Sequence, residues 1–315
     1  MGAEAIVLCT FYGEICSANS LCLYSTDPFM NSGLMEMFQE KGIVIAPGAY
    51  DAISAIMIEK AGFRSIYVGG ASTSYSTLGK PDLGFVGLEG MTRQISRIHD
   101  VSQLPLICDA DTGYGNELNV AFTVRAYEAA GASAIQIEDQ VTPKRCGHLS
   151  GKEVIPPEEM EIKVKAAVRA RRNALIIART DALAINGIGD AIERANRYLE
   201  AGADLAFVES PRTREELHQI GREVKGLKMA NMVEGGKTPL TPARDLMEMG
   251  FSLVIYPGAP IRAALMGIQR MLGTLLREGS TAGYLENMVD FGSLQKILGT
   301  EEILKGGFLP EAPFS

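Results

Sequence analysis

The chain has 315 residues, of which 46% are hydrophobic, and a formal net charge of −8. A chain of this size can bury a large core, either as one big α/β domain or as two smaller ones. The acidic balance argues against a nucleic-acid partner, because binding to phosphates needs a basic face. No apolar run of the sequence reaches the length needed to cross a bilayer. We therefore expect a protein that binds neither nucleic acid nor membrane.

The five cysteines show neither a CxxC pair nor the spacing of a zinc site. An odd number of scattered thiols suits a reducing compartment, so we expect a cytoplasmic protein. Three of these cysteines lie within the first 30 residues, which contain no Lys or Arg and so do not resemble a secretory signal. We interpret residues 1–34 as an N-terminal extension that is either disordered or an arm contacting another subunit.

One sequence pattern recurs along the chain: an amphipathic helix ends at a glycine, and an apolar run follows. Gly62 and Gly131 are two examples, and a glycine just past a helix end accepts the left-handed conformation found there. The apolar runs lack period-2 alternation, as strands covered on both faces do. Eight such runs predict strands at 43–47, 65–69, 105–109, 134–138, 175–179, 205–209, 228–232 and 253–257. The helices predicted between them lie near 52–61, 88–100, 117–130, 158–171, 189–201, 213–224 and 242–249.

Alternation of strands and helices predicts parallel strands joined by right-handed crossovers. Eight such units within residues 35–258 favour an α/β fold of the TIM type, a closed (β/α)₈ barrel. An open doubly wound sheet would need a glycine-rich phosphate loop after the first strand, and residues 46–50 do not form one. Residues 259–315 are predicted to add two or three helices that complete the barrel and contact other subunits.

The carboxyl ends of barrel strands meet in one pocket, so the residues found there indicate the site. In this chain they are mostly charged or polar, and buried charges need partners. The predicted strand ends carry Gly69 and Gly70, Asp109 and Asp111, Glu138, Arg179, Glu209, Asn231, and Tyr256 followed by Pro257.

The acids at these ends predict a metal site. Asp109 and Asp111 are two residues apart and can reach one hard cation, with Glu138 completing the set. Oxygen ligands without histidine favour Mg²⁺, or Mn²⁺ as a substitute. The alternative is that one of these carboxylates simply pairs with Arg179. We favour the metal, because so many acids in one pocket would repel one another without a cation.

Two further groups suit a substrate that carries a carboxylate. Arg179 offers a planar fork of donors. Gly69 and Gly70 present bare backbone N–H groups that can hold a carboxylate oxygen, although paired glycines are often no more than a turn.

A basic loop follows the fourth predicted strand and contains a cysteine, Cys146, between cations. Nearby positive charge lowers the pKa of a thiol and makes the sulfur a usable acid, base or nucleophile. The alternative is a solvated basic loop that happens to hold a cysteine. The position of the loop, directly after a strand ending in carboxylates, favours a chemical role.

Five segments together resemble the isocitrate lyase/phosphoenolpyruvate mutase superfamily. They read DADTGYG (109–115), EDQ (138–140), KRCGH (144–148), ARTDA (178–182) and NMVEGGKTP (231–239). The resemblance implies a (β/α)₈ barrel whose eighth helix is swapped between subunits, usually in a tetramer, so we expect a homotetramer. It also implies a Mg²⁺ enzyme that acts on 2-oxoacid and malate-type substrates through an enolate.

The resemblance also implies roles for individual residues in the pocket. The acids that match the metal site of the family are Asp82, Asp109, Asp111 and Glu138. The residues that match groups holding the pyruvyl or oxalyl part are Gly69, Gly70 and Arg179, and those that match polar pocket residues are Glu209 and Asn231.

The KRCGH segment matches a gating loop of the family, in whose lyases the cysteine exchanges a proton with the enolate of the departing acid. That resemblance gives this role to Cys146, and we expect Arg145 and Gly147 to contact the substrate. We expect His148 to stabilise the enolate rather than only to shape the loop. The base that removes the substrate hydroxyl proton is either Tyr50 or a metal-bound group.

The same loop favours cleavage of a carbon–carbon bond, because phosphorus–carbon mutases and phosphonopyruvate hydrolases of the superfamily generally lack the KRCGH signature. The resulting hypothesis is a lyase that cleaves a 2-hydroxy dicarboxylate to pyruvate and a carboxylic acid. The substrate would be an alkylated malate such as 2,3-dimethylmalate or 2-methylisocitrate. A phosphonopyruvate-processing enzyme and a catalytically inactive barrel are the less favoured alternatives.

Pro257 bears on the choice among subfamilies. The lyases for methylated malates resemble this chain in having proline there, whereas oxaloacetate hydrolases of the petal death protein group tend to have a hydroxyl residue. Proline lacks a side-chain donor and leaves an apolar wall that suits a methyl group. Oxaloacetate hydrolysis or decarboxylation stays the main alternative. The third carboxylate of 2-methylisocitrate would need a further cation, which Arg262 could supply, so 2,3-dimethylmalate is favoured by a small margin.

Overall fold

The computed structural model describes residues 32–147, 149 and 151–306. Eight parallel strands form one sheet in the order β1-β8-β7-β6-β5-β4-β3-β2, as predicted. The strands are β1 (Val44–Pro47), β2 (Ile66–Val68), β3 (Leu106–Asp109), β4 (Ala132–Glu138), β5 (Leu175–Thr180), β6 (Leu205–Val208), β7 (Leu227–Asn231) and β8 (Leu253–Tyr256).

The sheet closes where β1 meets β2. Gly48 forms a bridge with Tyr67, and the N–H of Ala49 donates to the carbonyl oxygen of Tyr67 at 2.9 Å. On the other side of β1, a Cβ atom on Gly48 would lie 2.1 Å from the carbonyl oxygen of Pro257. A side chain at this position would force β1 and β8 apart, so glycine is required there. The predicted TIM-type barrel is thereby confirmed.

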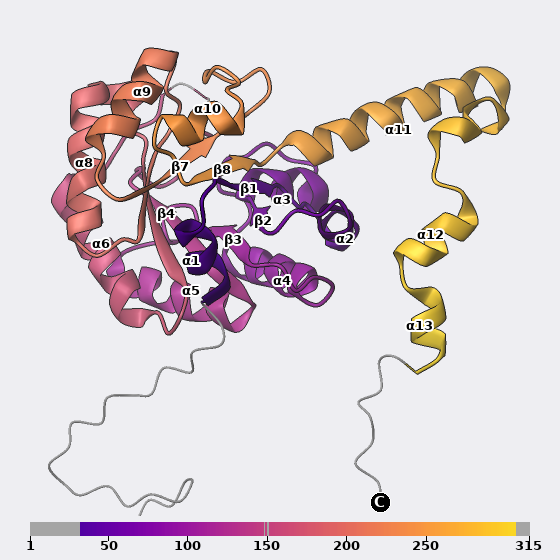
Figure 1. Cartoon of the computed structure of the whole chain (residues 1–315), viewed down its shortest axis with the longest axis horizontal. Helices are drawn as coiled ribbons and strands as arrows, with labels where there is room; N and C mark the ends of the chain where they lie inside the picture. Colours follow the sequence, from indigo (N-terminus) through magenta and orange to yellow (C-terminus); the bar gives the residue numbers. More distant parts are fainter. Residues whose placement is uncertain (1–31, 148, 150, 307–315) are drawn as a thin grey trace, which may run out of the picture.

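Helices alternate with the strands and cover the outside of the barrel (Figure 1). Those that agree with the predicted ranges are α2 (Ala52–Lys60), α4 (Leu88–His99), α5 (Glu117–Ala129), α6 (Pro157–Ala170), α8 (Ile188–Glu200), α9 (Arg214–Glu223) and α10 (Ala243–Glu248). Those that were not predicted are α1 (Ser32–Gln39), α3 (Gly70–Leu78) and α7 (Leu183–Asn186). Helix α3 is rich in Ser and Thr and so gives no apolar periodicity.

The helix ends follow local chemistry. Helix α2 begins at a capping box, in which the Asp51 carboxylate accepts from the Ser54 N–H at 2.8 Å. It is followed by Gly62, whose φ of +87° is the left-handed conformation predicted from the recurring sequence pattern. The predicted N-terminal extension lies almost wholly outside the described residues, because α1 begins at Ser32.

Side chains along each strand point alternately into the barrel and toward the helices. On β5, Leu175 and Ile177 pack in the cluster inside the barrel, whereas Ile176 and Ala178 pack in the cluster beneath the helices. The next inward position after Ile177 is Arg179. The same alternation gives the inward series of the other strands a polar end, at Asp109, Glu138, Glu209 and Asn231. The interior of the barrel is therefore apolar along most of each strand and charged at the carboxyl ends of the strands.

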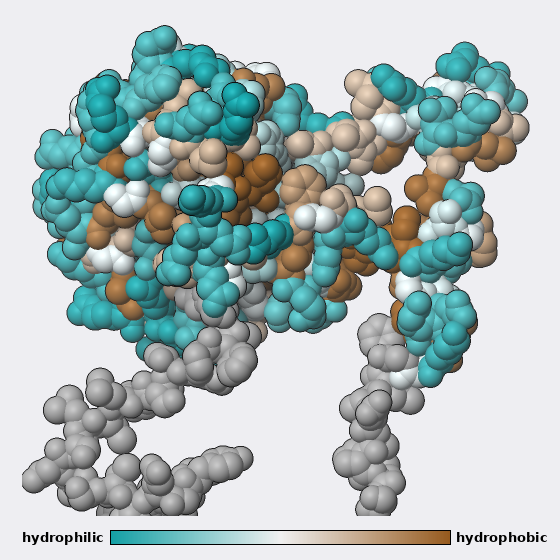
Figure 2. Space-filling view, in the orientation of Figure 1, coloured by the Kyte–Doolittle hydropathy of each residue, from teal (hydrophilic) through white to brown (hydrophobic). Residues whose placement is uncertain are grey.

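The predicted C-terminal helices are present and extend away from the barrel as an arm (Figure 1). The arm comprises α11 (Ala259–Glu278), the 3₁₀ helix η1 (Ala282–Asn287), α12 (Phe291–Ile297) and α13 (Thr300–Leu304). It exposes large apolar side chains, including Leu276 at 89% and Phe291 at 80% (Figure 2). No described helix is both long and apolar enough to cross a membrane.

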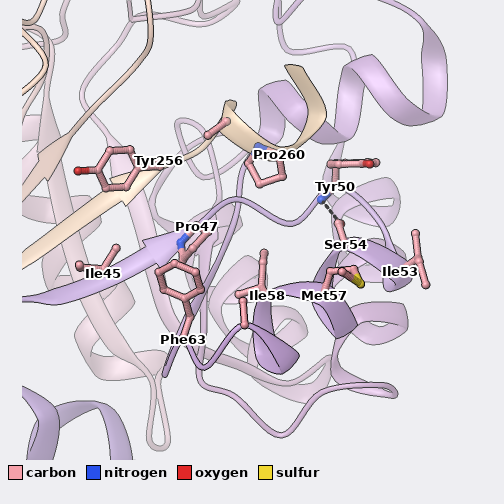
Figure 3. Close-up of a pocket in the computed structure, with 12 residues that line it drawn as sticks. Ile45, Pro47, Tyr50, Ile53, Ser54, Met57, Ile58, Phe63, Tyr256 and Pro260 are labelled. Carbon is pink, nitrogen blue, oxygen red and sulfur yellow. Dashed lines mark hydrogen bonds between the residues drawn. The ribbon is translucent and has the colours of Figure 1, made fainter. Parts of the chain in front are cut away.

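An apolar groove of about 710 Å³ lies on the outer side of β1 and β8, where α11 leaves the barrel (Figure 3). Its lining residues come from β1, α2 and its flanking loops, β8 and the start of α11, and include Ile45, Pro47, Met57, Phe63, Tyr256 and Pro260. The exposed arm and this groove are thus two apolar surfaces of the same chain.

Candidate active site

Asp109 is held in place by three donors from neighbouring elements. Its Oδ1 accepts from the backbone N–H of Asp111 and from Nε2 of Gln136, both at 3.1 Å. Its Oδ2 accepts from the N–H of Gly70 at 3.3 Å. The start of α3, which follows Gly69, is thereby joined to the end of β3. The two glycines and the first predicted acid therefore meet at one point of the pocket.

Asp111 and Asp82 share a lysine from the basic loop. Lys144 Nζ lies 2.5 Å from Asp82 Oδ1 and 2.8 Å from Asp111 Oδ1. Burial raises the pKa of Asp111 to about 7, even though the ammonium group of Lys144 opposes this shift. The backbone of Asp111 is left-handed, with φ of +47°. Such strain occurs where the surroundings fix a functional side chain.

Arg179 is surrounded by carboxylates. Its Nε donates to Asp181 Oδ2 at 2.9 Å, Nη1 lies 3.1 Å from Glu138 Oε2, and Nη2 lies 3.7 Å from Glu209 Oε2. The guanidinium group also lies over the Phe207 ring, 5.4 Å from its centroid, a cation–π contact. The ion pair with Glu138, raised above as an alternative to the metal, is therefore present.

The acids fit a metal ion in their chemistry. Neither carboxylate oxygen of Glu138 accepts a hydrogen bond from a described residue, although the side chain is 1% exposed. Burial raises the pKa of Glu138 well above its usual value, against the opposing effect of Arg179. As they stand, however, the described His, Cys, Asp and Glu side chains include no group of three placed to hold a metal ion. Hard oxygen donors that accept no hydrogen bond suit Mg²⁺ or Mn²⁺.

Glu209 and Asn231 form a second polar pair in the pocket. Ser210 Oγ donates to Glu209 Oε1 at 2.6 Å, and Asn231 Nδ2 donates to Glu209 Oε2 at 3.2 Å. The amide oxygen of Asn231 is buried and accepts no hydrogen bond from a described residue. It is thus an acceptor that a substrate hydroxyl could satisfy.

The loop that carries Cys146 is clamped at its base and closed over the pocket. Gln140 Nε2 donates to the carbonyl oxygen of Arg145 at 2.8 Å, and its Oε1 accepts from the Arg145 N–H at 2.9 Å. Gly147 lies directly against the site, since a Cβ atom there would lie 2.7 Å from both Arg179 Nη2 and Glu209 Cδ. The thiol of Cys146 is partly exposed.

Three further predicted residues have contacts outside this cluster, and a fourth cannot be placed. Tyr50 lines the apolar groove (Figure 3), and burial together with Asp51 raises the pKa of its hydroxyl. Arg262 is half exposed and pairs with Glu234 at 3.4 Å. The backbone of Pro257 packs against β1, and His148 lies outside the described residues.

Sequence reasoning missed several residues that organise the site. Gln140 and Asp181 lie within the family segments EDQ and ARTDA, so their proximity to named residues was a usable signal. Lys144 was noted as a loop cation, but its contact with two acids depends on how the loop folds. Lys152 gave no sequence signal, because its partners are a distant carboxylate and a backbone carbonyl. Ser210 follows the predicted Glu209 directly, so its position was a usable signal.

The chain is similar in sequence to a known family and to named relatives. Residues 34–276 match the phosphoenolpyruvate phosphomutase family. The chain is 43% identical over 272 residues to 2,3-dimethylmalate lyase of Eubacterium barkeri, covering 86% of this chain and 94% of that protein. It is 42% identical over 281 residues to 2-methylisocitrate lyase of Aeropyrum pernix, covering 89% and 91%.

Solved structures are similar over most of their length. An oxaloacetate acetylhydrolase in complex with 3,3-difluorooxalacetate matches with a TM-score of 0.83 and 32% identity, covering 90% of this chain and 98% of that one. A phosphonopyruvate hydrolase in complex with oxalate and Mg²⁺ matches with a TM-score of 0.79 and 29% identity, covering 88% and 97%. This chain belongs to the phosphoenolpyruvate mutase/isocitrate lyase superfamily.

Proposed function

We propose that this protein is a Mg²⁺-dependent carbon–carbon lyase that cleaves an alkylated malate to pyruvate and a carboxylic acid. The observation that carries the proposal is the packing of Gly147 against Arg179 and Glu209. This packing brings the loop bearing Cys146 onto the pocket that contains Arg179, whose guanidinium group would bind a substrate carboxylate. Relatives that are lyases, at 43% and 42% identity, support the reaction class.

The substrate would be bound through its 2-hydroxy acid part. Arg179 would bind the carboxylate next to the hydroxyl, and its contacts with Asp181 fix the plane of the guanidinium group. The unpartnered amide oxygen of Asn231 would accept from the substrate hydroxyl. These contacts orient the bond to be broken relative to the loop.

The metal would be held by the buried acids Asp109, Asp111 and Glu138, with Asp82 beside them. Mg²⁺, or Mn²⁺ in its place, stabilises negative charge on substrate oxygen atoms when it is bound. The structure of a similar phosphonopyruvate hydrolase with oxalate and Mg²⁺ supports this choice of ion.

The reaction would break the bond between C2 and C3 of the substrate. A base removes the hydroxyl proton, the C2 oxygen becomes a carbonyl, and the C2–C3 electron pair passes to the other half as an enediolate. Cys146 donates its proton to C3 of that enediolate, which leaves as the carboxylic acid. The closed loop excludes water from the pocket, so the enediolate is protonated by the thiol.

One observation favours a dicarboxylate such as 2,3-dimethylmalate over 2-methylisocitrate. The positive charge of Arg262 is already paired with Glu234, so a third substrate carboxylate would have to compete for it. Pro257 offers no side-chain donor near the eighth strand, which favours a methylated malate over oxaloacetate. Oxaloacetate hydrolysis is the second candidate, favoured by the similarity to oxaloacetate acetylhydrolase.

We also propose that the protein is a cytoplasmic homotetramer in which α11 is swapped between subunits. The apolar arm of one subunit would cover the groove beside β1 and β8 of another. Large exposed leucines on α11, such as Leu276, support this arrangement, because soluble proteins rarely leave such patches uncovered.

The proposal is tested by a coupled lactate dehydrogenase assay with Mg²⁺. The substrates 2,3-dimethylmalate, 2-methylisocitrate and citramalate are offered in parallel, and oxalate release from oxaloacetate is followed separately. We expect Mg²⁺-dependent pyruvate from a methylated malate, fastest from 2,3-dimethylmalate. Oxalate from oxaloacetate, without pyruvate from any malate, would show the hydrolase instead.

A further inference from the structure

Lys152 is a buried cation in the loop that carries Cys146, and the proposed chemistry does not use this lysine. Its side chain is 2% exposed. Nζ donates to the carbonyl oxygen of Gly147 and to Asp181 Oδ1, both at 2.6 Å. An ammonium group is costly to bury unless it is paired and hydrogen-bonded, and both partners of Lys152 belong to the active site.

Asp181 is shared between this lysine and the arginine that would bind substrate. Its Oδ1 accepts from Arg179 Nη2 at 3.1 Å as well as from Lys152, and its Oδ2 accepts from Arg179 Nε at 2.9 Å. Attraction to both cations holds the pKa of Asp181 below its usual value, against the effect of burial. One carboxylate therefore orients a residue of the barrel and a residue of the loop.

The other partner of Lys152 is the peptide next to Cys146. The carbonyl oxygen of Gly147 accepts from Lys152, and Ser210 Oγ lies 3.2 Å from the same oxygen. The position of this carbonyl fixes the backbone that follows Cys146. Gly147 is also the residue packed against Arg179 and Glu209.

We infer that Lys152 is a positioning residue: through Asp181 it couples closure of the Cys146 loop to the orientation of Arg179. This inference deepens the proposed function and rests on it. In the loop conformation of this structure, the ammonium group of Lys152 completes the set of donors around Asp181. The thiol and the substrate-binding guanidinium group then reach their reactive arrangement together.

The test measures alkylation of Cys146 by iodoacetamide in the full-length protein without substrate, followed by peptide mass spectrometry. Lys152→Met should raise the rate at least about tenfold, because a hydrogen bond to a charged group contributes more than a factor of ten to an equilibrium. Loss of a nearby cation alone would raise the thiol pKa and slow alkylation, so an increase reports loop opening.

Lys228→Met is the matched control, because Lys228 is also buried and its Nζ donates to carbonyl oxygens, those of Val224 at 2.9 Å and Gly226 at 3.0 Å, near the amino end of β7. We expect this variant to react at the wild-type rate. Lys152→Gln provides a second test if Lys152→Met does not fold, since it keeps a donor for Gly147 but loses the ion pair; its alkylation should also be faster.

A kinetic readout separates positioning from a purely structural role. Lys152→Met should lower kcat/KM for the substrate in protein whose circular dichroism spectrum shows that it is folded, and Lys152→Arg should restore part of the loss. A wild-type alkylation rate in the folded Lys152 variants would overturn the inference. Alkylation needs no substrate, so that outcome is distinct from failure of the lyase proposal.

Discussion

Cys146 acts in a setting that its neighbours create. Gln140 fixes the backbone of Arg145, Lys152 fixes the carbonyl of Gly147, and the thiol lies between these two anchors. Cys108, the other described cysteine, is wholly buried on the outer face of β3. The same residue type therefore serves packing in one place and, on the proposed mechanism, proton transfer in the other.

Cys146→Ser should lower carbon–carbon cleavage by about 10²-fold or more, the usual scale for a lost proton-transfer group. The melting temperature and Mg²⁺ binding should not change, because the loop keeps its anchors. Pyruvate release measures the effect, and Cys108→Ala, which should retain cleavage, is the control. Near-normal turnover of Cys146→Ser would remove this cysteine from the mechanism.

Asp109→Asn should abolish both Mg²⁺ binding and the Mg²⁺ dependence of activity, because it replaces a charged ligand with a neutral one of the same shape. Isothermal titration calorimetry measures the binding. The matched control is Asp245→Asn, which removes a surface carboxylate paired with Arg214 at 2.9 Å. Undiminished Mg²⁺ binding by Asp109→Asn would contradict the site assignment.

At the scale of elements, the recurring sequence pattern with its glycine and the apolar runs were enough to predict all eight strands and the helices between most of them. Helix α3 was missed, because its sequence GASTSYSTL carries no apolar stripe and its glycine looked like part of a turn. Which strand-end residues face the pocket followed from the parallel barrel. The contacts of Lys144 and Lys152 could not be predicted, since they depend on how one loop folds back over the carboxyl ends of the strands.

The loop itself offers a prediction at this scale. Gly147→Ala should lower kcat/KM at least about tenfold, equivalent to ~1.4 kcal/mol, because the new Cβ would collide with Arg179 and Glu209 and keep the loop from closing. The colliding atoms are 2.7 Å from the Cβ position. The control is Gly189→Ala on α8, where nothing lies within 4 Å and activity should be kept. Unchanged kcat/KM in Gly147→Ala would show that closure is not required.

At the scale of the whole molecule, no described residue covers the apolar arm or the apolar groove (Figures 1 and 3). The sequence predicted the helices of the arm, whereas the groove depends on where α11 departs from the barrel. Each surface would be unfavourable in water on its own, and their proximity to the same strand pair explains how copies of one chain could complete each other. On this view the barrel is fully covered only in the assembly.

Leu276→Glu should therefore dissociate the proposed tetramer, because each buried leucine contributes roughly 1.5–3 kcal/mol and a buried carboxylate adds a penalty. Size-exclusion chromatography with light scattering measures the mass. Gln269→Glu, which adds the same charge at another exposed position of α11, should leave the assembly intact. A monomeric wild-type protein would refute the swapped arrangement.

The central claim is that the enzyme breaks a carbon–carbon bond and protonates the departing half. Its most direct test is to follow 2,3-dimethylmalate with Mg²⁺ in D₂O by NMR. The account predicts equal amounts of pyruvate and propionate, with one deuterium next to the propionate carboxylate. If the substrate stayed intact while oxaloacetate gave oxalate and acetate, the lyase account would be contradicted and the hydrolase reading would replace it.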